Sequence, residues 1–268
     1  MKFLSSKDRG KIKIFGVPYD STPCFRPGAR FGADGIRLFS ENLEDFSPEL
    51  EKSLEDLDFT DVGNLELPAS PEKMVEEIYS FVREVEIPVM LGGEHSVTFP
   101  VVKALSERFS GLTVVQFDAH ADLREEYSGT PYSHACVMRR ILELPNTQLI
   151  QVGIRSGTKE EFDLIKSSNR ITYVKDVLEL PSVLSEVETP IYFTVDIDFF
   201  DPSYAPGTGT PEHCGASPVD FFKAVYKLPA ASVVGFDVVE VSPPYDPSGI
   251  TQALGAKIVR ELLLKFWG

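Results

Sequence analysis

The sequence predicts an α/β fold built on a buried parallel sheet, and three observations carry that prediction. Short runs of apolar, β-branched and aromatic residues recur along the chain. Stretches with helical periodicity separate these runs, as expected for strand–helix–strand units. The runs are apolar throughout instead of alternating with polar residues, so we expect helices to cover both faces of the sheet.

About eight strands are expected. The clearer strands comprise residues 12–17, 87–91, 112–117, 148–154, 191–195 and 232–239, and weaker candidates lie at 57–62 and 171–174. Helical periodicity extends over residues 71–85, 97–109, 134–142, 159–166, 218–226 and 251–266. This number of strands in 268 residues is compatible with a closed barrel and with an open sheet covered by helices on both faces. The pattern alone does not choose between them.

The composition limits the class of protein. The chain has 26 basic and 41 acidic residues, a net charge of −15, and 43% hydrophobic residues, which is enough for a sizeable core. We expect neither nucleic acid nor membrane as a partner, because a negative field repels both. No apolar run approaches the roughly 20 residues that span a bilayer. The opening MKFLSSKDRG lacks the apolar segment of a signal peptide.

The three cysteines show neither disulfide nor zinc spacing, which favours a reducing compartment. We therefore expect a cytoplasmic protein folded as a single domain over residues 1–268. Cys24 and Cys136 are expected to be small packing residues.

Acidic and histidine residues follow four of the clearer strands. GGEHS at 92–96 follows the second strand, DAHAD at 118–122 follows the third, and DID at 196–198 follows the fifth. The sixth strand contains Asp237 and is followed by Glu240. In both candidate architectures the functional residues gather at the carboxyl ends of the strands. The sequence therefore predicts that these side chains converge.

Their chemistry indicates a metal centre. The candidate ligands are His95, Asp118, His120, Asp122, Asp196 and Asp198. In an extended chain, residues two apart point the same way, so residues 118, 120 and 122 are expected to form one row. Four carboxylates packed with two imidazoles need cations to hold them together, and bridging carboxylates allow two ions. Oxygen and imidazole ligands without thiolate favour Mn²⁺, with Fe²⁺, Co²⁺ and Zn²⁺ as alternatives.

Each motif alone has a plainer interpretation. An Asp-x-Asp pair after a strand is most often a turn or a helix cap, and a lone histidine is more often structural than a ligand. Three such motifs at three different strand ends favour the metal site over these interpretations.

The segments GGEHS, FDAHAD (117–122) and DIDxxDPxxAPGTGTPE (196–212) resemble the three signatures of the ureohydrolases. That family includes arginase, agmatinase, formimidoylglutamase and guanidinobutyrase. The similarity extends from residues 14–37 to the last expected helix, so it covers nearly the whole chain. It implies a three-layer α/β/α sandwich around an eight-stranded parallel sheet, which decides against the barrel. It also implies a homo-oligomer, either a trimer or a hexamer.

The resemblance further implies hydrolysis of a guanidinium group to urea and an amine by a hydroxide that bridges two Mn²⁺ ions per subunit. Two metals lower the pKa of a shared water enough for it to attack this unreactive carbon. One ion would be held by His95, Asp118, Asp122 and Asp196, and the other by Asp118, His120, Asp196 and Asp198.

Three residues complete the implied mechanism. Glu240 matches the glutamate that binds the guanidinium, a task that suits a carboxylate. His134 matches the histidine that binds substrate and passes protons to the departing amine, which fits a side chain with a pKa near neutrality. Asp122 is carried over to the catalytic set as well as to the ligand set. Glu94 matches no ligand and is expected to support its loop.

The prediction of the substrate rests on residues that are less specific than the metal-ligand motifs. Arginases hold the substrate carboxylate partly through an asparagine two residues after the DAHAD segment, where this chain has Arg124, and this difference disfavours arginase. Residues 132–135 and 152–157 resemble the agmatinase form, and Glu125 and Glu126 could face a distal ammonium group. We expect a small cationic guanidine as substrate, namely agmatine, which would be cleaved to putrescine and urea.

Aminopropylagmatine is an alternative substrate. Arginine, guanidinobutyrate and formimidoylglutamate are others, because Arg124 could bind their carboxylate. Two other classes of protein fit the sequence less well. A dinuclear phosphoesterase lacks support because no basic group for phosphate accompanies these strand ends. A non-catalytic polyamine-binding relative would need a broken ligand set, whereas all six candidate ligands are present.

Overall fold

The computed structural model describes residues 1–229 and 232–268. Its centre is an eight-stranded parallel sheet in the order β4-β1-β5-β10-β9-β6-β7-β8. The strands are β1 (Ile12–Gly16), β4 (Phe59–Asn64), β5 (Ile87–Leu91), β6 (Leu112–Phe117), β7 (Thr147–Val152), β8 (Ile171–Val174), β9 (Ile191–Asp196) and β10 (Val233–Val239). All eight expected strands are present. Because β4 and β8 form its two edges, the sheet is open, and the barrel is excluded.

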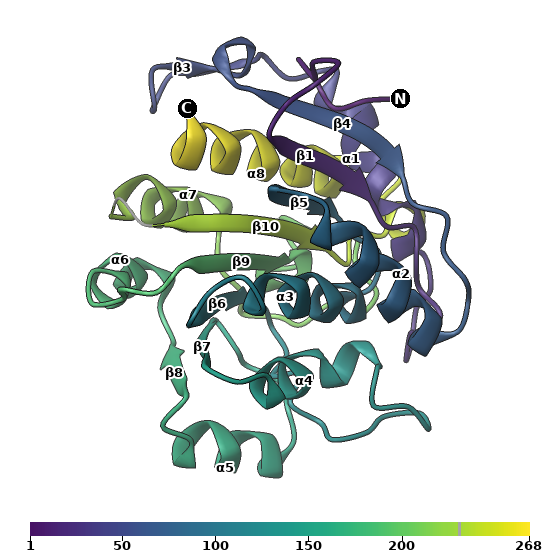
Figure 1. The fold of residues 1–268 in the computed structure, drawn as a ribbon, viewed down its shortest axis with the longest axis vertical. Helices are drawn as coiled ribbons and strands as arrows, with labels where there is room; N and C mark the ends of the chain where they lie inside the picture. The colour runs from purple at the N-terminus through teal and green to yellow at the C-terminus, as the bar shows by residue number, and fades with distance from the viewer. Residues whose placement is uncertain (230–231) are drawn as a thin grey trace.

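Helices cover both faces of the sheet (Figure 1). Helices α1, α6, α7 and α8 contribute to the apolar cluster on one face, and α2, α3, α4 and α5 to the cluster on the other. Their bounds are α1 (Gly32–Ser40), α2 (Pro71–Arg83), α3 (Thr98–Ser106), α4 (Val137–Glu143), α5 (Lys159–Ser167), α6 (Leu180–Leu184), α7 (Pro218–Lys227) and α8 (Ile250–Trp267). The predicted three-layer α/β/α architecture is confirmed.

Seven of the eight strands are largely apolar because they contribute to both clusters, whereas β4 contributes only Phe59, to the cluster that includes α8. In β9, Phe193 and Val195 belong to the cluster that includes α8, whereas Tyr192 belongs to the cluster that includes α3. Successive side chains of a strand point to opposite faces, so covering both faces with helices requires apolar residues at nearly every position.

The sequence did not reveal two helices and one small hairpin. Helix α1 contains two glycines and has no side-chain cap at its start, so it lacks the usual signals of a helix beginning. Helix α6 has only five residues, too few to show a period. The hairpin pairs β2 (Phe46–Ser47) with β3 (Lys52–Ser53). The helix expected at 134–142 begins as a separate 3-10 turn, η4 (His134–Cys136).

The topology brings four strand ends together. Strands β5, β10, β9 and β6 are consecutive neighbours in the middle of the sheet, although β5 and β10 are far apart in the sequence. Neighbouring strands lie about 4.8 Å apart. The segments that follow these four strands therefore meet at one edge of the sheet, and they are the four segments that carry the candidate site residues.

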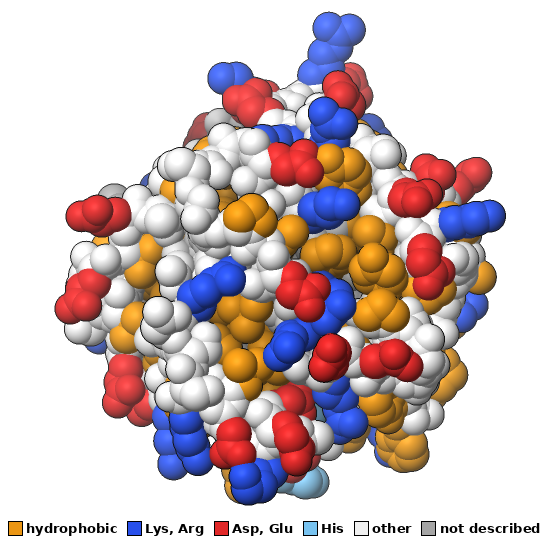
Figure 2. Space-filling view, turned by 60° about the horizontal axis from the view of Figure 1, so that its bottom comes forward, with side chains coloured by type: hydrophobic (Ala, Val, Ile, Leu, Met, Phe, Trp, Pro, Cys, Tyr) orange, Lys and Arg blue, Asp and Glu red, His pale blue; other side chains and the backbone are white. Residues whose placement is uncertain are grey.

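The surface shows no gathering of one charge on the face seen in Figure 2, where acidic and basic side chains are interspersed with apolar ones. Over residues 1–229 and 232–268, no helix is both long and apolar enough to cross a membrane.

Gly93 allows the ends of β1, β5 and β10 to approach one another. The N–H of Glu94 donates to the carbonyl of Tyr19 at 2.8 Å, and the N–H of Glu240 donates to the carbonyl of Gly93 at 2.9 Å. A Cβ atom at residue 93 would lie 1.8 Å from the Tyr19 carbonyl oxygen. Only glycine fits there without moving backbone that holds the site.

We expect Gly93→Ala to lower the free energy of unfolding by about 1–3 kcal/mol, because the added methyl group must displace backbone. Urea denaturation of the variant and the wild type measures this difference. Gly111→Ala is the matched control, because its Cβ would lie 3.2 Å from the Thr189 side chain and 3.6 Å from the Asn146 carbonyl oxygen, without the severe backbone overlap found at residue 93. Equal stability of Gly93→Ala and the wild type would contradict this reading of the strand ends.

Candidate metal centre and active site

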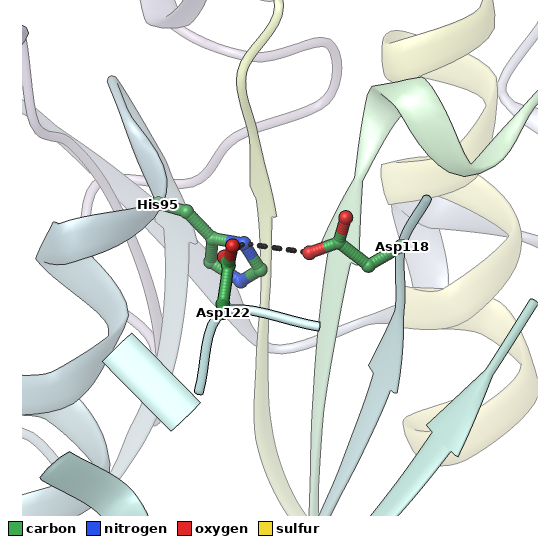
Figure 3. A group of neighbouring side chains, drawn as sticks. All are labelled: His95, Asp118 and Asp122. Atoms are coloured by element: carbon green, nitrogen blue, oxygen red, sulfur yellow. Dashed lines mark ion pairs between the residues drawn. The ribbon is translucent and has the colours of Figure 1, made fainter. Parts of the chain in front are cut away.

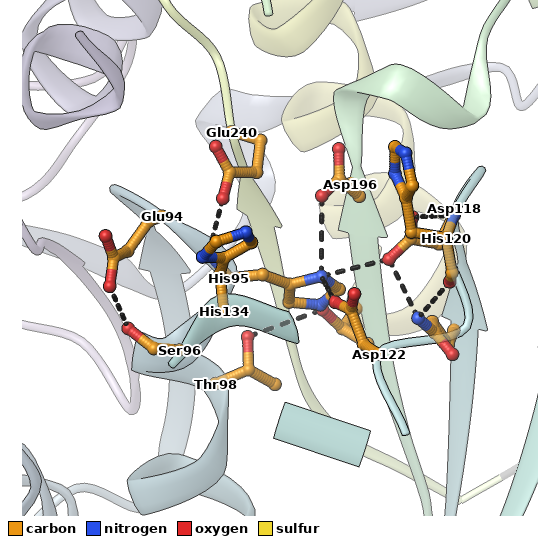
Figure 4. Close-up of polar contacts among 12 residues, drawn as sticks. Glu94, His95, Ser96, Thr98, Asp118, His120, Asp122, His134, Asp196 and Glu240 are labelled. Atoms are coloured by element: carbon orange, nitrogen blue, oxygen red, sulfur yellow. Dashed lines mark hydrogen bonds and ion pairs between the residues drawn. The ribbon is translucent and has the colours of Figure 1, made fainter. Parts of the chain in front are cut away.

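The structure brings all six predicted metal ligands together where β5, β6 and β9 end, and Figure 4 labels all of them except Asp198. They are His95, Asp118, His120, Asp122, Asp196 and Asp198. All except His120 are buried. Burying four carboxylates this close together is unfavourable unless positive charge accompanies them.

The first cluster surrounds His95. Its Nδ1 atom lies 3.0 Å from Asp118 Oδ2, 3.2 Å from Asp122 Oδ2 and 3.4 Å from Asp196 Oδ2. Figure 3 shows His95, Asp118 and Asp122 pointing toward one another. Despite these distances, His95 Nδ1 is a buried atom without a hydrogen-bond partner. An unpaired imidazole nitrogen that faces three carboxylates fits the ligand set of a divalent cation.

The second cluster surrounds His120. Its Nδ1 atom lies 2.9 Å from Asp198 Oδ2 and 3.7 Å from Asp118 Oδ1. The two groups that could each hold one ion are His95, Asp118, Asp122 and Asp118, His120, Asp198. Asp118 belongs to both and turns one oxygen to each, as a bridging carboxylate does. Asp196 turns one oxygen to His95, while the other accepts the N–H of Asp198 at 2.9 Å.

The backbone reaches this arrangement by bending. The expectation that residues 118–122 form one extended row is wrong, because Asp122 has a φ of 54°. Asp198 lies in the 3-10 turn η6 (Ile197–Phe199), not on an extended strand. Glu240, with a φ of 61°, is a second site residue in the left-handed region. Non-glycine residues in sparsely populated conformations cost about 1–3 kcal/mol each and concentrate at functional sites.

Gln116, Gln151 and Thr194 support the candidate ligands through hydrogen bonds, and the sequence alone did not reveal these residues. Gln116 donates from Nε2 to Asp118 Oδ2 at 2.8 Å and in turn accepts from Gln151 Nε2 at 2.7 Å. Thr194 Oγ1 lies 2.9 Å from His95 Nε2. Gln116 and Thr194 each precede an acidic candidate by two residues inside an apolar strand. That spacing is the signal that could have found them, because residues two apart share a face.

Glu94 supports the loops around His134. Its carboxylate accepts hydrogen bonds from the N–H and the hydroxyl of Thr22, at 2.8 and 2.6 Å, and from Ser96 Oγ at 2.6 Å. The Thr22 hydroxyl oxygen in turn accepts the N–H of His134 at 3.3 Å. Glu94 thus links the segment after β1 to the turn that carries His134, which agrees with its expected supporting role.

His134 and Glu240 both face the cavity beside the two clusters (Figure 4). Burial lowers the pKa of His134 to about 4, so its imidazole is neutral at pH 7. Burial and the nearby Glu94 raise the pKa of Glu240 well above its usual range. Glu240 Oε1 accepts the N–H of His95 at 2.8 Å.

The cavity has a volume of about 210 Å³. Its lining includes the buried His95, Asp122 and Asp196 and the half-buried Glu240. Cys24 is exposed and also lines the cavity, so the expectation that it is a packing residue is wrong, whereas Cys136 is buried as expected. A larger depression of about 640 Å³, near β7 and β8, contains none of the candidate ligands, so chemistry points to the smaller cavity.

Arg124 is the cation of the cavity wall. Its guanidinium lies 4.8 Å from the ring centre of Tyr127, and its Nε is 4.0 Å from Glu161. The Glu161 oxygens already accept the N–H groups of Leu123 and Thr158, so Arg124 is only loosely paired.

The idea that Glu125 and Glu126 face the substrate is wrong. Both side chains are exposed and line a separate surface depression next to the cavity. An ammonium group in the cavity would therefore not meet them.

Comparison with known proteins agrees with the geometry. The sequence model of the arginase family matches residues 10–265. The chain belongs to the arginase family. It is 40% identical to an agmatinase of Bacillus anthracis over 98% of this chain and 94% of that protein. It is 36% identical to the N(1)-aminopropylagmatine ureohydrolase of Thermococcus kodakarensis over 93% of this chain and 90% of that protein.

Solved structures agree as well. The agmatine ureohydrolase of Thermoplasma volcanium superposes with a TM-score of 0.89 at 32% identity, covering 98% of this chain and 93% of that one. Membership of the arginase family makes the chain a ureohydrolase-type enzyme, a hydrolase of C–N bonds in linear amidines.

Protonation in the absence of metal gives a testable pH dependence. Burial and Asp118 raise the pKa of Asp122 to about 7. Burial lowers the pKa of His120, but Asp198 and Asp118 outweigh burial and raise it overall. Both shifts favour the protonated forms in the folded state, so their stabilisation is lost as pH rises, between about 4 and 7 for Asp122 and above about 6.5 for His120. The lowered pKa of His134 acts in the opposite direction, but only between about 4 and 6.5.

We expect the melting temperature of the metal-free protein to fall between about pH 6.5 and about pH 8. The increase caused by added Mn²⁺ is expected to grow over the same range, because metals bind deprotonated ligands. Thermal unfolding with a chelator and with Mn²⁺ measures both quantities. An equal or smaller Mn²⁺ effect at the higher pH would contradict the assignment of these residues as ligands.

Proposed function

We propose that this enzyme hydrolyses agmatine to putrescine and urea with two Mn²⁺ ions per subunit, in polyamine synthesis, as a single-domain cytoplasmic homo-oligomer. The observation that carries the proposal is the pair of clusters that share Asp118, with Glu240 and His134 in the same cavity. Agmatinases that are 40% identical over nearly the full length support the substrate. When bound, two ions supply Lewis acidity and lower the pKa of a water that they share.

The ligand sets are carried over from the family resemblance. One ion is assigned to His95, Asp118, Asp122 and Asp196, which agrees with the distances from His95 Nδ1. The other is assigned to Asp118, His120, Asp196 and Asp198, of which Asp118 and Asp198 lie near His120 Nδ1. Carboxylate and imidazole donors without thiolate support Mn²⁺ over softer metals. Asp122 belongs to both the ligand set and the catalytic set, because its carboxylate also lines the cavity where the guanidinium must lie.

Glu240 is assigned to binding the guanidinium. The N–H of His95 holds its Oε1 atom, which leaves Oε2 for a guanidinium N–H. A cation placed there offsets the cost of ionising this carboxylate, whose pKa is raised. Because Oε1 is fixed by backbone and the strained backbone of Glu240 is fixed by Gly93, the planar guanidinium is held in one orientation.

His134 is assigned to proton transfer. A neutral imidazole accepts a proton when water adds to the guanidinium carbon, and the resulting imidazolium gives it to the departing amine. The low pKa of His134 makes that imidazolium a ready donor. The backbone N–H of His134 donates a hydrogen bond to the hydroxyl oxygen of Thr22, which keeps His134 at the cavity.

Arg124 is the observation that favours a second candidate. Its loosely paired guanidinium on the cavity wall would attract a carboxylate and repel an ammonium group. A carboxylate-bearing guanidine or formimidoyl compound is therefore the alternative substrate. Aminopropylagmatine, named for the Thermococcus kodakarensis relative, is the other.

Urea release tests the proposal most simply. Mn²⁺-loaded enzyme is assayed with agmatine and L-arginine at equal concentrations, and urea from agmatine alone is the expected result. Preference for arginine would reject agmatine and make Arg124 the carboxylate anchor. Aminopropylagmatine is assayed in parallel, and urea released mainly from it would assign the enzyme to that substrate instead.

The same assay is run on two histidine variants. His134→Asn is expected to lower kcat by about 10²–10⁴-fold, because it removes the proton carrier. His213→Asn is the matched control, since His213 is exposed and does not line the cavity.

A further inference from the structure

Asp237 is a buried carboxylate that the proposed mechanism does not use. It lies on β10, is completely buried, and does not line the cavity. Three hydroxyl groups donate to it: Tyr192 at 2.7 Å and Thr98 at 2.9 Å to Oδ2, and Thr194 at 2.5 Å to Oδ1. These bonds offset the cost of burying the group, but they do not explain why an acid is placed there.

The hydroxyl of Thr194 transmits the effect of Asp237 to His95. A hydroxyl has one proton, and Thr194 gives it to Asp237. Its oxygen, 2.9 Å from His95 Nε2, can therefore only accept from that nitrogen. The proton of a neutral His95 must then lie on Nε2, which leaves the lone pair on Nδ1.

We infer that Asp237 and Thr194 are positioning residues that fix His95 as the Nε2–H tautomer and thereby present Nδ1 as a metal ligand. Nδ1 is the buried, unpaired atom that faces three carboxylates. The inference rests on the proposed metal centre and extends it to residues outside the cavity. An acceptor behind the second nitrogen of a histidine ligand fixes its tautomer and its ring orientation.

The register of the sheet explains why these residues are available. Asp237 pairs with Thr194 across β10 and β9, Thr194 pairs with Gln116 across β9 and β6, and Gln116 pairs with Gln151 across β6 and β7. Residues in one register row point to the same face of the sheet. The four polar side chains thus form a buried row, one level below the ligands that end the strands. Gln116 fixes Asp118 as Thr194 fixes His95.

Metal binding tests the inference with a readout other than activity. Mn²⁺ is titrated calorimetrically into metal-free wild type, Thr194→Val and Thr194→Ser. Thr113→Val is the control, because Thr113 is a buried strand threonine whose hydroxyl contacts Thr189 at 2.6 Å instead of a ligand. Two binding events are expected for the wild type. Thr194→Val is expected to weaken one of them about 10–100-fold. Thr194→Ser should restore it, and Thr113→Val should bind like the wild type.

The tautomer is observed directly in ¹⁵N-histidine-labelled protein loaded with diamagnetic Zn²⁺, since the chain has only four histidines. The wild type should show a proton on Nε2 of His95 and the metal on Nδ1. In Asp237→Asn the amide can donate to Thr194, so the population of that form should fall.

Several results would overturn the inference. Thr194→Val could bind Mn²⁺ at both sites with wild-type affinity, or it could weaken both sites equally. Thr194→Ser could fail to restore binding. The wild type could carry the proton of His95 on Nδ1. A wild type that binds no Mn²⁺ would overturn the metal centre itself and this inference with it. Loss of agmatine hydrolysis with two intact binding events would reject only the proposed substrate.

Discussion

The structure depends on holding four carboxylates and two imidazoles within a few ångströms of one another in a buried place. Without metal, protons must supply the missing positive charge. Burial together with Asp198 and Asp118 accordingly raises the pKa of Asp196 well above its usual range. Two divalent cations would replace those protons and would leave the carboxylates ionised. Replacing the protons with metal ions would change an unfavourable cluster of acids into a centre that can bind a cationic substrate beside Glu240.

The fold meets this requirement with short connections. The candidate residues follow strands that are neighbours in the sheet, so each side chain needs only a few residues of loop to arrive. Glycine at position 93 and left-handed backbone at Asp122 and Glu240 make the final bends. Glu94 accepts hydrogen bonds from Thr22 and so connects the loop after β5 to the loop after β1. The strain in these bends is offset by the hydrogen bonds that surround them, as is usual where geometry serves chemistry.

The sequence predicted what repeats or is chemically distinctive. Eight apolar runs indicated eight strands, and the spacing in 118–122 and 196–198 indicated the clusters around His95 and His120. It did not predict α1, which contains two glycines and lacks a side-chain cap, or the bend at Asp122, because nothing in the sequence marks an aspartate with left-handed backbone. It placed Glu125 and Glu126 on the wrong side of their loop, since exposed residues carry no periodic signal. The hydrogen bonds of Gln116 and Thr194 depend on strand register, which only the folded sheet defines.

Anomalous X-ray diffraction from Mn²⁺-soaked crystals can show whether two cations hold the converging carboxylates. We expect two anomalous peaks about 3.5–4 Å apart, one beside His95 and one beside His120, with Asp118 between them. A single peak would contradict the bridged arrangement. No peak, with the imidazoles still paired to carboxylates, would show that protons and not metals hold this site together.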